Sequence, residues 1–501
     1  MSYTLLTGAT GLLGRYLLAD LLLGARNVAV LVRPTRRESA EARVDRLLSL
    51  WEQRWKRNLP RPLVLTGDIL APSWGLDAAD RRWLSRRADR VLHSAASLTF
   101  HEEDGEPWAS NVGAVETMLR LCEETGIRLV EHVSTAYTCG LRTGRVLESE
   151  LDVGQEFGND YEKSKLHAEK LIRSARGLDA YTVFRPSIIV GDSQTGYTST
   201  YHGLYAPLRV ASALGNVIGI GDALEVDYLA LLGMKASDRK NFVPVDWVSE
   251  AIVSISSQGR PRNQTYALVT EHPVSTERLR RIFENSVREH LERLQVNLPV
   301  KAKGASAGGT ESRIRMEFFQ RQYVEQFSVY KSYWKDDPVF DCSNTKAALP
   351  GLPCPALTDE RLMLLCTHAL KTNFGFPPPK IELPTFLPRQ WFSGLGAVRP
   401  LPSPSVNGSN GRDYLSLTIT GPGGGDWVVS TGVSGSLDVE RGARQDGARA
   451  RMTADTFGRI VKGELSVDDA LAESRVLLQG HAAASDRLRR FASSATARQS
   501  I

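Results

Sequence analysis

The segment LLTGATGLLGRYLL, residues 5–18, constrains the fold of this chain more than any other stretch. A short apolar run leads into Gly8, Gly11 and Gly14, and a helix-length apolar run follows them. Glycines between a strand and a helix let the backbone turn tightly against a pyrophosphate, and the helix N-terminus offers unpaired N–H groups to its charge. The segment therefore predicts a nucleotide-binding turn. Its spacing is G-x-x-G-x-x-G rather than the G-x-G-x-x-G of many dehydrogenases.

Strand-like apolar runs recur through the first 190 residues, with helix-length segments between them. This alternation predicts an α/β fold built on a doubly wound parallel sheet. The predicted strands are Tyr3–Leu6, Val28–Val32, Pro62–Thr66, Arg90–His93, Leu129–Ser134 and Tyr181–Pro186.

Composition along the chain predicts three parts. Residues 1–375 form the main domain, with a cofactor part at about 1–190 and a substrate-facing part at about 187–375. In the substrate-facing part we expect helices at 276–294 and 359–371 and a small, polar loop at 301–312. A linker rich in proline, serine and glycine follows at 376–412. Residues 413–501 predict a smaller α/β domain, with strands in 414–420, 435–440 and 448–453 and helices in 453–463 and 466–478.

Charge and cysteine usage exclude several classes of protein. The net charge of +5 comes from 62 basic and 57 acidic residues without a long block of either sign, which argues against a nucleic-acid partner. The five cysteines include no C-x-x-C pair, so we expect reduced thiols and no metal site. Without a leader-like N-terminus or an apolar stretch of about 18 residues, the sequence predicts a cytoplasmic protein with no membrane span.

The end of the second predicted strand bears on the choice of cofactor. An acidic residue there suits the ribose 2′-hydroxyl of NAD, whereas an arginine suits the 2′-phosphate of NADP. This chain has VRPTRR, with Arg33 at the strand end and Arg36 and Arg37 behind it. The pattern favours NADP(H) over NAD(H); the alternative is a solvated basic turn.

Several motifs in one order give the chain a family resemblance over roughly residues 1–270. It resembles the extended short-chain dehydrogenase/reductases, near the branch of fatty acyl reductases and thioester reductase domains. The matching segments are TGATGLLG (7–14), LVRP (31–34), TGDIL (66–70), ADRVLHSAA (88–96), NVGA (111–114), VSTAYTCG (133–140), YEKSK (161–165), RPSIIVG (185–191) and FVPVDWV (242–248).

The resemblance implies a catalytic set. Tyr161 would protonate a carbonyl oxygen, and Lys165, one helical turn on, would favour its phenolate, since a free tyrosine pKa is about 10. Of the 14 tyrosines, Tyr161 alone has a lysine four residues later. Thr135 would bind the substrate oxygen, with Ser134 as the alternative. Asn111 would support a proton path behind the lysine, or it is a helix N-cap.

The resemblance also implies a cofactor-binding set. The glycine-rich turn, Arg33 and Lys165 would contact the cofactor, and further residues would flank the adenine, line the channel and face the carboxamide. Besides Gly8, Gly11 and Gly14, these are Thr10, Leu12, Leu13, Asp68, Ile69, Ala95, Ala96, Pro186 and Ser187.

The C-terminal residues 413–495 resemble sterol carrier protein 2, a small α/β lipid-binding module. That likeness implies either a cavity for an acyl or sterol-like tail or a degenerate module that assists folding or dimerisation.

Two reductase chemistries and one binding function fit the sequence. The first is hydride transfer between a nicotinamide cofactor and a carbonyl of a hydrophobic small molecule, such as a long-chain, prenylated or polyketide-like ketone. The second is reduction of an acyl thioester; because no carrier segment precedes the glycine-rich turn, its substrate would arrive in trans, for example on an acyl carrier protein. The third is a cofactor-binding lipid carrier without turnover. The oligomeric state stays open.

Overall fold

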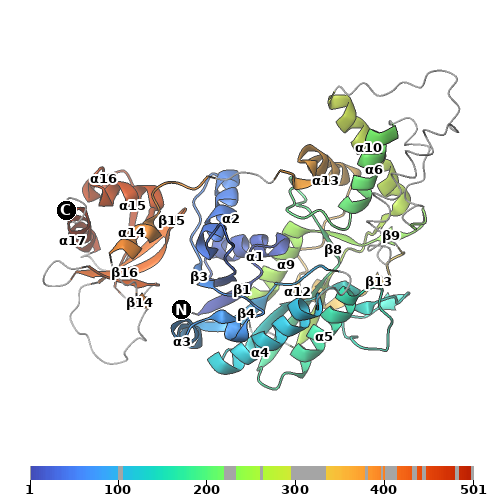
Figure 1. The fold of residues 1–501 in the computed structure, drawn as a ribbon, viewed down its shortest axis with the longest axis horizontal. Coiled ribbons are helices and arrows are strands. Elements are labelled where there is room, and N and C mark those ends of the chain that lie inside the picture. The colour runs from blue at the N-terminus through green and yellow to red at the C-terminus, as the bar shows by residue number, and fades with distance from the viewer. Residues whose placement is uncertain are drawn as a thin grey trace.

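The computed structural model describes residues 2–99, 105–218, 233–259, 263–294, 335–377, 382–395, 399–400, 414–431, 437–442, 447–479 and 484–497. The predicted 301–312 loop and much of the predicted 376–412 linker lie outside these ranges. Figure 1 shows a large α/β body and a smaller C-terminal domain beside helix α2.

A seven-stranded sheet forms the centre of the large body. Its strands run in the order β11-β7-β5-β4-β1-β2-β3, and every neighbouring pair is parallel. Such a sheet is covered on both faces, which is why its strands are continuous apolar runs rather than alternating ones. The predicted doubly wound sheet is confirmed. The strands are β1 (Tyr3–Thr7), β2 (Val28–Val32), β3 (Leu63–Thr66), β4 (Ala88–His93), β5 (Leu129–Val133), β7 (Ala180–Pro186) and β11 (Gln264–Leu268).

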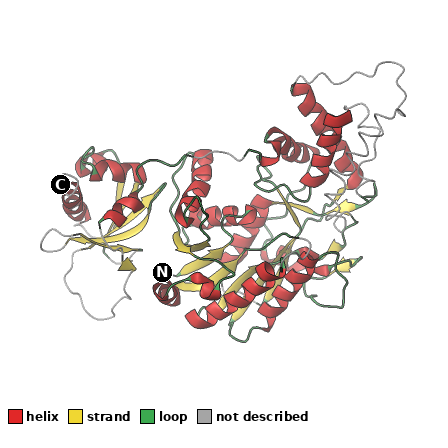
Figure 2. Ribbon diagram, in the orientation of Figure 1, coloured by secondary structure: helices red, strands yellow, loops and turns green. Residues whose placement is uncertain are grey.

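Helices cover both faces of this sheet (Figure 2). One face carries α1 (Leu12–Leu23), α2 (Ala40–Trp55) and α9 (Val245–Ser257), and the other carries α3 (Ala78–Arg87), α4 (Ala114–Thr125) and α5 (Asp160–Ser174). Side-chain caps set where three of them begin, and at α3 the Asp77 carboxylate accepts from the Ala79 and Asp80 N–H groups. Ser39 accepts from the Ala42 N–H at α2, and Asn159 accepts from the Glu162 N–H at α5.

The substrate-facing part follows the sheet with shorter elements and its own apolar core. Its strands are β6 (Arg145–Val146), β8 (Ile188–Val190), β9 (Arg239–Lys240), β10 (Phe242–Pro244), β12 (Val274–Ser275) and β13 (Val339–Phe340). Helices α6 (Tyr205–Ile218), α10 (Thr276–Arg293) and α13 (Asp359–Lys371) pack around that core, and α12 (Ser343–Ala348) lies against β11. The helices expected at 276–294 and 359–371 are confirmed as α10 and α13.

The C-terminal domain is a six-stranded sheet with helices on it, in the order β14-β17-β16-β15-β18-β19. Helices α15 and α17 pack together over β15 and β18. The expected strand at 435–440 corresponds to β17, and its first two residues lie outside the described ranges. The bounds are β14 (Arg399–Pro400), β15 (Tyr414–Thr420), β16 (Gly425–Thr431), β17 (Leu437–Arg441), β18 (Ala448–Thr453), α15 (Ala454–Val461), α16 (Val467–Ala472), β19 (Val476–Gln479) and α17 (Ala484–Ala497).

The helix expected over 466–478 is wrong in its second half. Helix α16 ends at Ala472, and Ser474 has φ +54°, which a continuing helix does not allow. The chain then forms β19, which pairs antiparallel with β18. In the sheet, the backbone of Val476 and its neighbours forms hydrogen bonds with β18, and the local sequence does not reveal this pairing.

A helix also forms inside the segment expected to be a linker. Helix α14 (Pro388–Gly394) begins at a proline, which suits the first helical position. Its Phe392 is fully buried and stacks on Trp427, with ring centroids 4.3 Å apart. This part of the chain therefore belongs to the core of the C-terminal domain.

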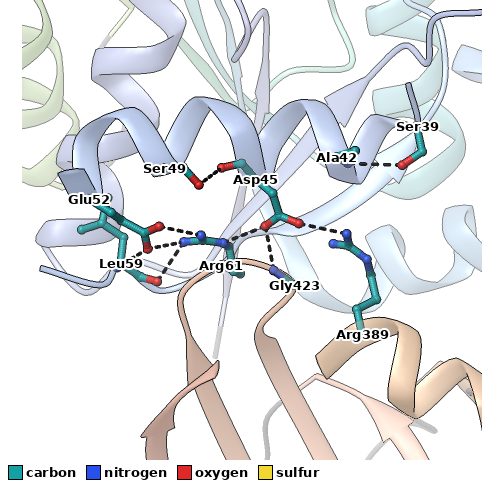
Figure 3. Close-up of polar contacts among 9 residues, drawn as sticks. All are labelled: Ser39, Ala42, Asp45, Ser49, Glu52, Leu59, Arg61, Arg389 and Gly423. Atoms are coloured by element: carbon teal, nitrogen blue, oxygen red, sulfur yellow. Dashed lines mark hydrogen bonds and ion pairs between the residues drawn. The ribbon is translucent and has the colours of Figure 1, made fainter. Parts of the chain in front are cut away.

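Helix α2 joins the two bodies through a buried carboxylate (Figure 3). Asp45, 1% exposed, accepts hydrogen bonds from Arg61 (2.9 Å), from Arg389 (2.9 Å) and from the Gly423 backbone N–H (3.1 Å). Arg61 also pairs with Glu52, at 2.8 Å. Arg389 and Gly423 belong to the C-terminal domain, so the contact is a charged, desolvated interface.

Candidate active site

The glycine-rich turn runs from the end of β1 into α1. Gly8 has φ +73°, and a Cβ there would lie 2.6 Å from the Ala95 nitrogen. A Cβ on Gly14 would lie 2.0 Å from the Gly8 oxygen. Only glycine fits at either place, and the resulting close approach leaves the N-terminus of α1 open beside the turn. This cradle fits a dinucleotide pyrophosphate.

The residues expected at the adenine end lie around the ends of β2 and β3. The exposed Arg33 guanidinium pairs with Asp68 at 3.2 Å, and Ile69 is partly buried. Arg43 of α2, which the sequence did not point to, donates to the Thr10 hydroxyl at 3.4 Å and to the Arg33 carbonyl. Nothing in the amphipathic pattern of α2 distinguishes this arginine from a solvated one.

Tyr161 and Lys165 project from the first turns of α5, which the Asn159 cap begins. Tyr161 is buried and hydrogen-bonds to the Thr135 side chain. Burial raises the pKa of Tyr161, the Thr135 hydrogen bond opposes the rise, and the Glu162 charge adds to it. The phenol is therefore held protonated, ready to donate.

Lys165 lies behind the tyrosine and is fully enclosed, at 1% exposure. Its Nζ donates to the Val133 carbonyl at 2.7 Å. Burial lowers the pKa of Lys165 to about 8, against the Glu169 carboxylate, which raises it. The ammonium and its neutral form are thus close in free energy near physiological pH.

Two hydroxyls follow β5, and they point to different partners. Thr135 Oγ1 lies 3.4 Å from the Pro186 carbonyl and accepts the Tyr137 N–H, besides its contact with Tyr161. Ser134 instead donates to Glu169 at 3.1 Å. Of the two hydroxyls, the geometry places that of Thr135 next to the tyrosine.

Asn111 lies in a π-helical turn, Ala109–Gly113, just before α4, and it is buried. Its amide donates to Ser164 (3.0 Å) and to the Ser97 carbonyl (3.3 Å), and its oxygen accepts the Ser97 N–H. Ser164 in turn donates to the Tyr161 carbonyl at 2.8 Å. The N-cap alternative is wrong, because Gly113 precedes α4 and the Asn111 side chain bridges to α5 instead.

The remaining expected residues lie at the same carboxyl edge of the sheet. Ala95 follows β4 and donates its N–H to Thr7, Ala96 beside it is exposed, and Leu12 and Leu13 open α1. Pro186 ends β7, and Ser187 is buried, with its hydroxyl 2.7 Å from the Asn241 amide oxygen. In an open parallel sheet this edge is where ligands bind.

Two buried histidines were missed. His93 ends β4 and His132 lies in β5, and their rings stack with centroids 5.5 Å apart. The sequence did carry a signal, since His93 ends an apolar run in VLHSAA and His132 lies beside Glu131 between apolar residues in LVEHVST. A polar ring in a buried strand needs a partner, and Lys165 is nearby.

Two further properties concern the described residues only. They contain no group of three or more His, Cys, Asp or Glu side chains placed to hold a metal ion. None of their helices is both long and apolar enough to cross a bilayer.

Comparisons with known proteins agree with this architecture. Residues 6–252 match the NAD-binding family described as male sterility protein. The chain is 29% identical to isonitrile lipopeptide synthase of Streptomyces coeruleorubidus over 56% of its own length, and 24% identical to fatty acyl-CoA reductase wat of Drosophila melanogaster over 50%. These alignments cover 18% and 53% of the two relatives, so this chain spans only part of either protein's length.

Among solved structures, the chain is similar to the terminal R domain of the myxalamid PKS-NRPS biosynthetic pathway. The two share 26% sequence identity and a TM-score of 0.55, over 76% of this chain and 93% of that one. Residues 6–252 therefore match the NAD-binding male sterility protein family in sequence, and the chain shares the Rossmann-type fold of a solved R domain.

Proposed function

We propose that this chain reduces an acyl thioester to an aldehyde, with NADPH as the hydride donor. The observation that carries the proposal is the Thr135–Tyr161 hydrogen bond, with Lys165 one turn behind it, beside a glycine turn that fits a dinucleotide. The similarity to a terminal R domain and to a fatty acyl-CoA reductase favours a thioester over the hydrophobic ketone that the sequence also allows.

A nicotinamide cofactor held at the glycine turn would supply a hydride to the carbonyl carbon of the thioester. Thr135 and Tyr161 hold the carbonyl oxygen, and Tyr161 gives it a proton as negative charge develops. The product is a hemithioacetal, which breaks its C–S bond to release a thiol and an aldehyde. Lys165 stabilises the resulting phenolate, and a proton returns to Tyr161 from solvent through the Asn111 side of the site. A second hydride and proton would convert the aldehyde to an alcohol.

Arg33 and Arg43 support the choice of NADPH. Both arginines come from the segment around β2 and α2, and both belong to the group around Thr10 and Asp68. Guanidinium groups recognise a 2′-phosphate by paired, charge-assisted hydrogen bonds. The thiol that carries the acyl group is coenzyme A or the phosphopantetheine of a carrier protein, which share the same thioester chemistry.

Replacing Tyr161 with phenylalanine tests the reaction. Losing the proton donor should reduce turnover of an acyl-CoA by about 100- to 10,000-fold, while NADPH binding changes little. Loss of nicotinamide absorbance reports turnover, with a hydrophobic ketone assayed in parallel. Tyr181→Phe, at the opposite end of β7, is the matched control. Full activity in the Tyr161→Phe protein contradicts the assignment, and turnover of the ketone alone contradicts the substrate class.

The C-terminal domain supports the reductase by docking, in our proposal, rather than by carrying a lipid in the manner of sterol carrier protein 2. Phe392, Phe457 and Phe491 fill the space over its sheet, with the Phe392 and Phe457 rings 5.1 Å apart. A cavity of about 10 Å³ near Tyr414 has room for one water molecule. If docking is its role, weakening the Asp45 contacts destabilises the reductase as well; a carrier tethered by a linker would leave the reductase unchanged.

A further inference from the structure

Behind Lys165, the stacked histidines His93 and His132 form a buried pair that no step above uses. Each is 1% exposed, and the ring planes lie within 14° of each other. They occupy neighbouring strands, β4 and β5, directly under the end of the sheet that carries the site. Burying two imidazoles in an apolar sheet is costly unless their nitrogens find partners.

The contacts of this pair run from the lysine to the glycine turn. His132 Nε2 lies 3.5 Å from Lys165 Nζ. His93 Nδ1 lies 2.9 Å from the Thr7 hydroxyl, which also accepts the Ala95 N–H at 3.3 Å. Ala95 is the residue against which Gly8 packs. Within the described part of the chain, His132 Nδ1 has no partner.

Both imidazoles are neutral. Burial, with the Lys165 charge adding to its effect, lowers the pKa of His93 to about 3. Burial also holds the pKa of His132 well below its usual value, with Lys165 and His93 adding to the effect. A neutral imidazole has one acceptor nitrogen, and an ammonium offers only N–H donors. His132 therefore accepts from Lys165 through Nε2 and carries its own proton on Nδ1.

We propose that His132 is a positioning residue, whose neutral ring accepts an N–H of Lys165 and holds the ammonium between Tyr161 and the cofactor. His93 and Thr7 support that ring and connect it to the glycine turn. The proposal rests on the role given to Lys165 in the proposed function. It adds a specific requirement, which is an acceptor at the position of His132 Nε2.

The charges facing Lys165 fix the direction of the expected effect. Glu169 faces it from its own helix, His132 and His93 face it from β5 and β4, and the four-residue spacing puts Tyr161 on the same side of α5. Glu169 already pairs with Arg173 and Arg185, which compensates its charge. The hydrogen bond to His132 stabilises the buried ammonium. Removing this acceptor therefore lowers the pKa of Lys165 further, and Lys165 loses its proton at a lower pH.

Three substitutions separate positioning from packing. His132→Phe keeps a ring against His93 and removes both nitrogens. His132→Asn stays polar but is too short to reach Lys165. His132→Gln places an amide oxygen at about the reach of Nε2. His290→Phe, a partly exposed histidine at the end of α10, controls for loss of a histidine elsewhere.

The measurement is the pH dependence of NADPH binding, followed by nucleotide fluorescence, because it needs no acyl substrate. Below its pKa of about 8, Lys165 is protonated and binds the ribose, so wild-type affinity should fall above that pH. Losing a hydrogen bond to a charged group should move this fall about one pH unit lower in the Phe and Asn variants. The Gln variant and the His290 control should keep the wild-type profile.

An unchanged profile in the folded Phe or Asn protein overturns the proposal. A shift of equal size in the Gln variant does so too, because it would show a packing role. If the Phe variant does not fold, the Asn and Gln pair decides. A wild-type protein that binds NADPH and reduces no thioester contradicts the proposed function alone, and the binding profiles still test His132.

Discussion

At the scale of single residues, surroundings rather than residue type set the chemistry of this site. Burial favours the neutral form of both members of the Tyr161–Lys165 pair, so the phenol keeps its proton while the ammonium is held less firmly. Thr135 and Glu169 act in the opposite direction on the two groups. The pair therefore works where the tyrosine and the lysine are both protonated, which is below about pH 8.

Arg33 provides the residue-scale test of cofactor choice. Replacing it with alanine removes a charged partner for a 2′-phosphate, which is worth about 1.5–3 kcal/mol, or roughly 10- to 150-fold in affinity. NADPH binding should weaken by that factor, and NADH binding should stay the same. Arg120→Ala on α4 is a matched control, because both arginine side chains are 69% exposed. Equal weakening for both nucleotides would assign Arg33 to a general electrostatic role instead.

At the scale of elements, the β1 turn and α1 form one tight unit. Gly14, inside the helix, packs against the Gly8 carbonyl. The added Cβ in Gly14→Ala would clash with that carbonyl oxygen, so the backbone of the turn must move away from α1. We expect dinucleotide binding to be lost and the melting temperature to fall. Gly24→Ala at the other end of α1 is the control, because a Cβ there meets only ordinary contacts, the nearest at 3.4 Å. Retained binding in the Gly14→Ala protein would contradict the cradle.

The local sequence pattern predicts well which segments form strands, and it predicts less well which strands pair with each other. Apolar runs between polar residues, such as Val28–Val32, coincide with strands because a fully buried parallel strand has no polar face to interrupt the run. The prediction of a helix over 466–478 failed in its second half because that segment pairs with β18, and the local sequence does not reveal a contact with a distant strand. Tyr161 and Lys165 were accessible to sequence reasoning because their spacing is helical.

The site residues that sequence reasoning missed act through contacts distant in the chain. Arg43 approaches Thr10 across 33 residues, and His132 approaches Lys165 across the same separation. An arginine on an exposed helix or a histidine in a strand says little by itself. Their meaning comes from which element the fold places opposite them, and a single sequence does not carry that information.

At the scale of the whole molecule, the Asp45 carboxylate holds the two bodies together. Asp45→Asn keeps the shape but leaves Arg61 and Arg389 without their shared negative partner in a desolvated place. Breaking such a pair costs about 3–5 kcal/mol, so thermal unfolding should shift to a clearly lower temperature and separate into two transitions. Asp468→Asn, which removes an exposed ion pair with Arg489, is the control and should change stability by less than about 1 kcal/mol. A single, unshifted transition in the Asp45 variant would show that this carboxylate does not hold the bodies together.

Helix α2 serves both bodies at once. Arg43 faces the glycine turn, and Asp45, two residues on and so on the other side of the helix, faces the C-terminal domain. A chimera that exchanges the reductase while keeping this C-terminal domain must therefore inherit Asp45, Glu52 and Arg61 together with Arg389 and the turn at Gly423. For evolution as for engineering, the exchangeable unit does not end at the proline-rich segment; it extends back into the helix beside the cofactor.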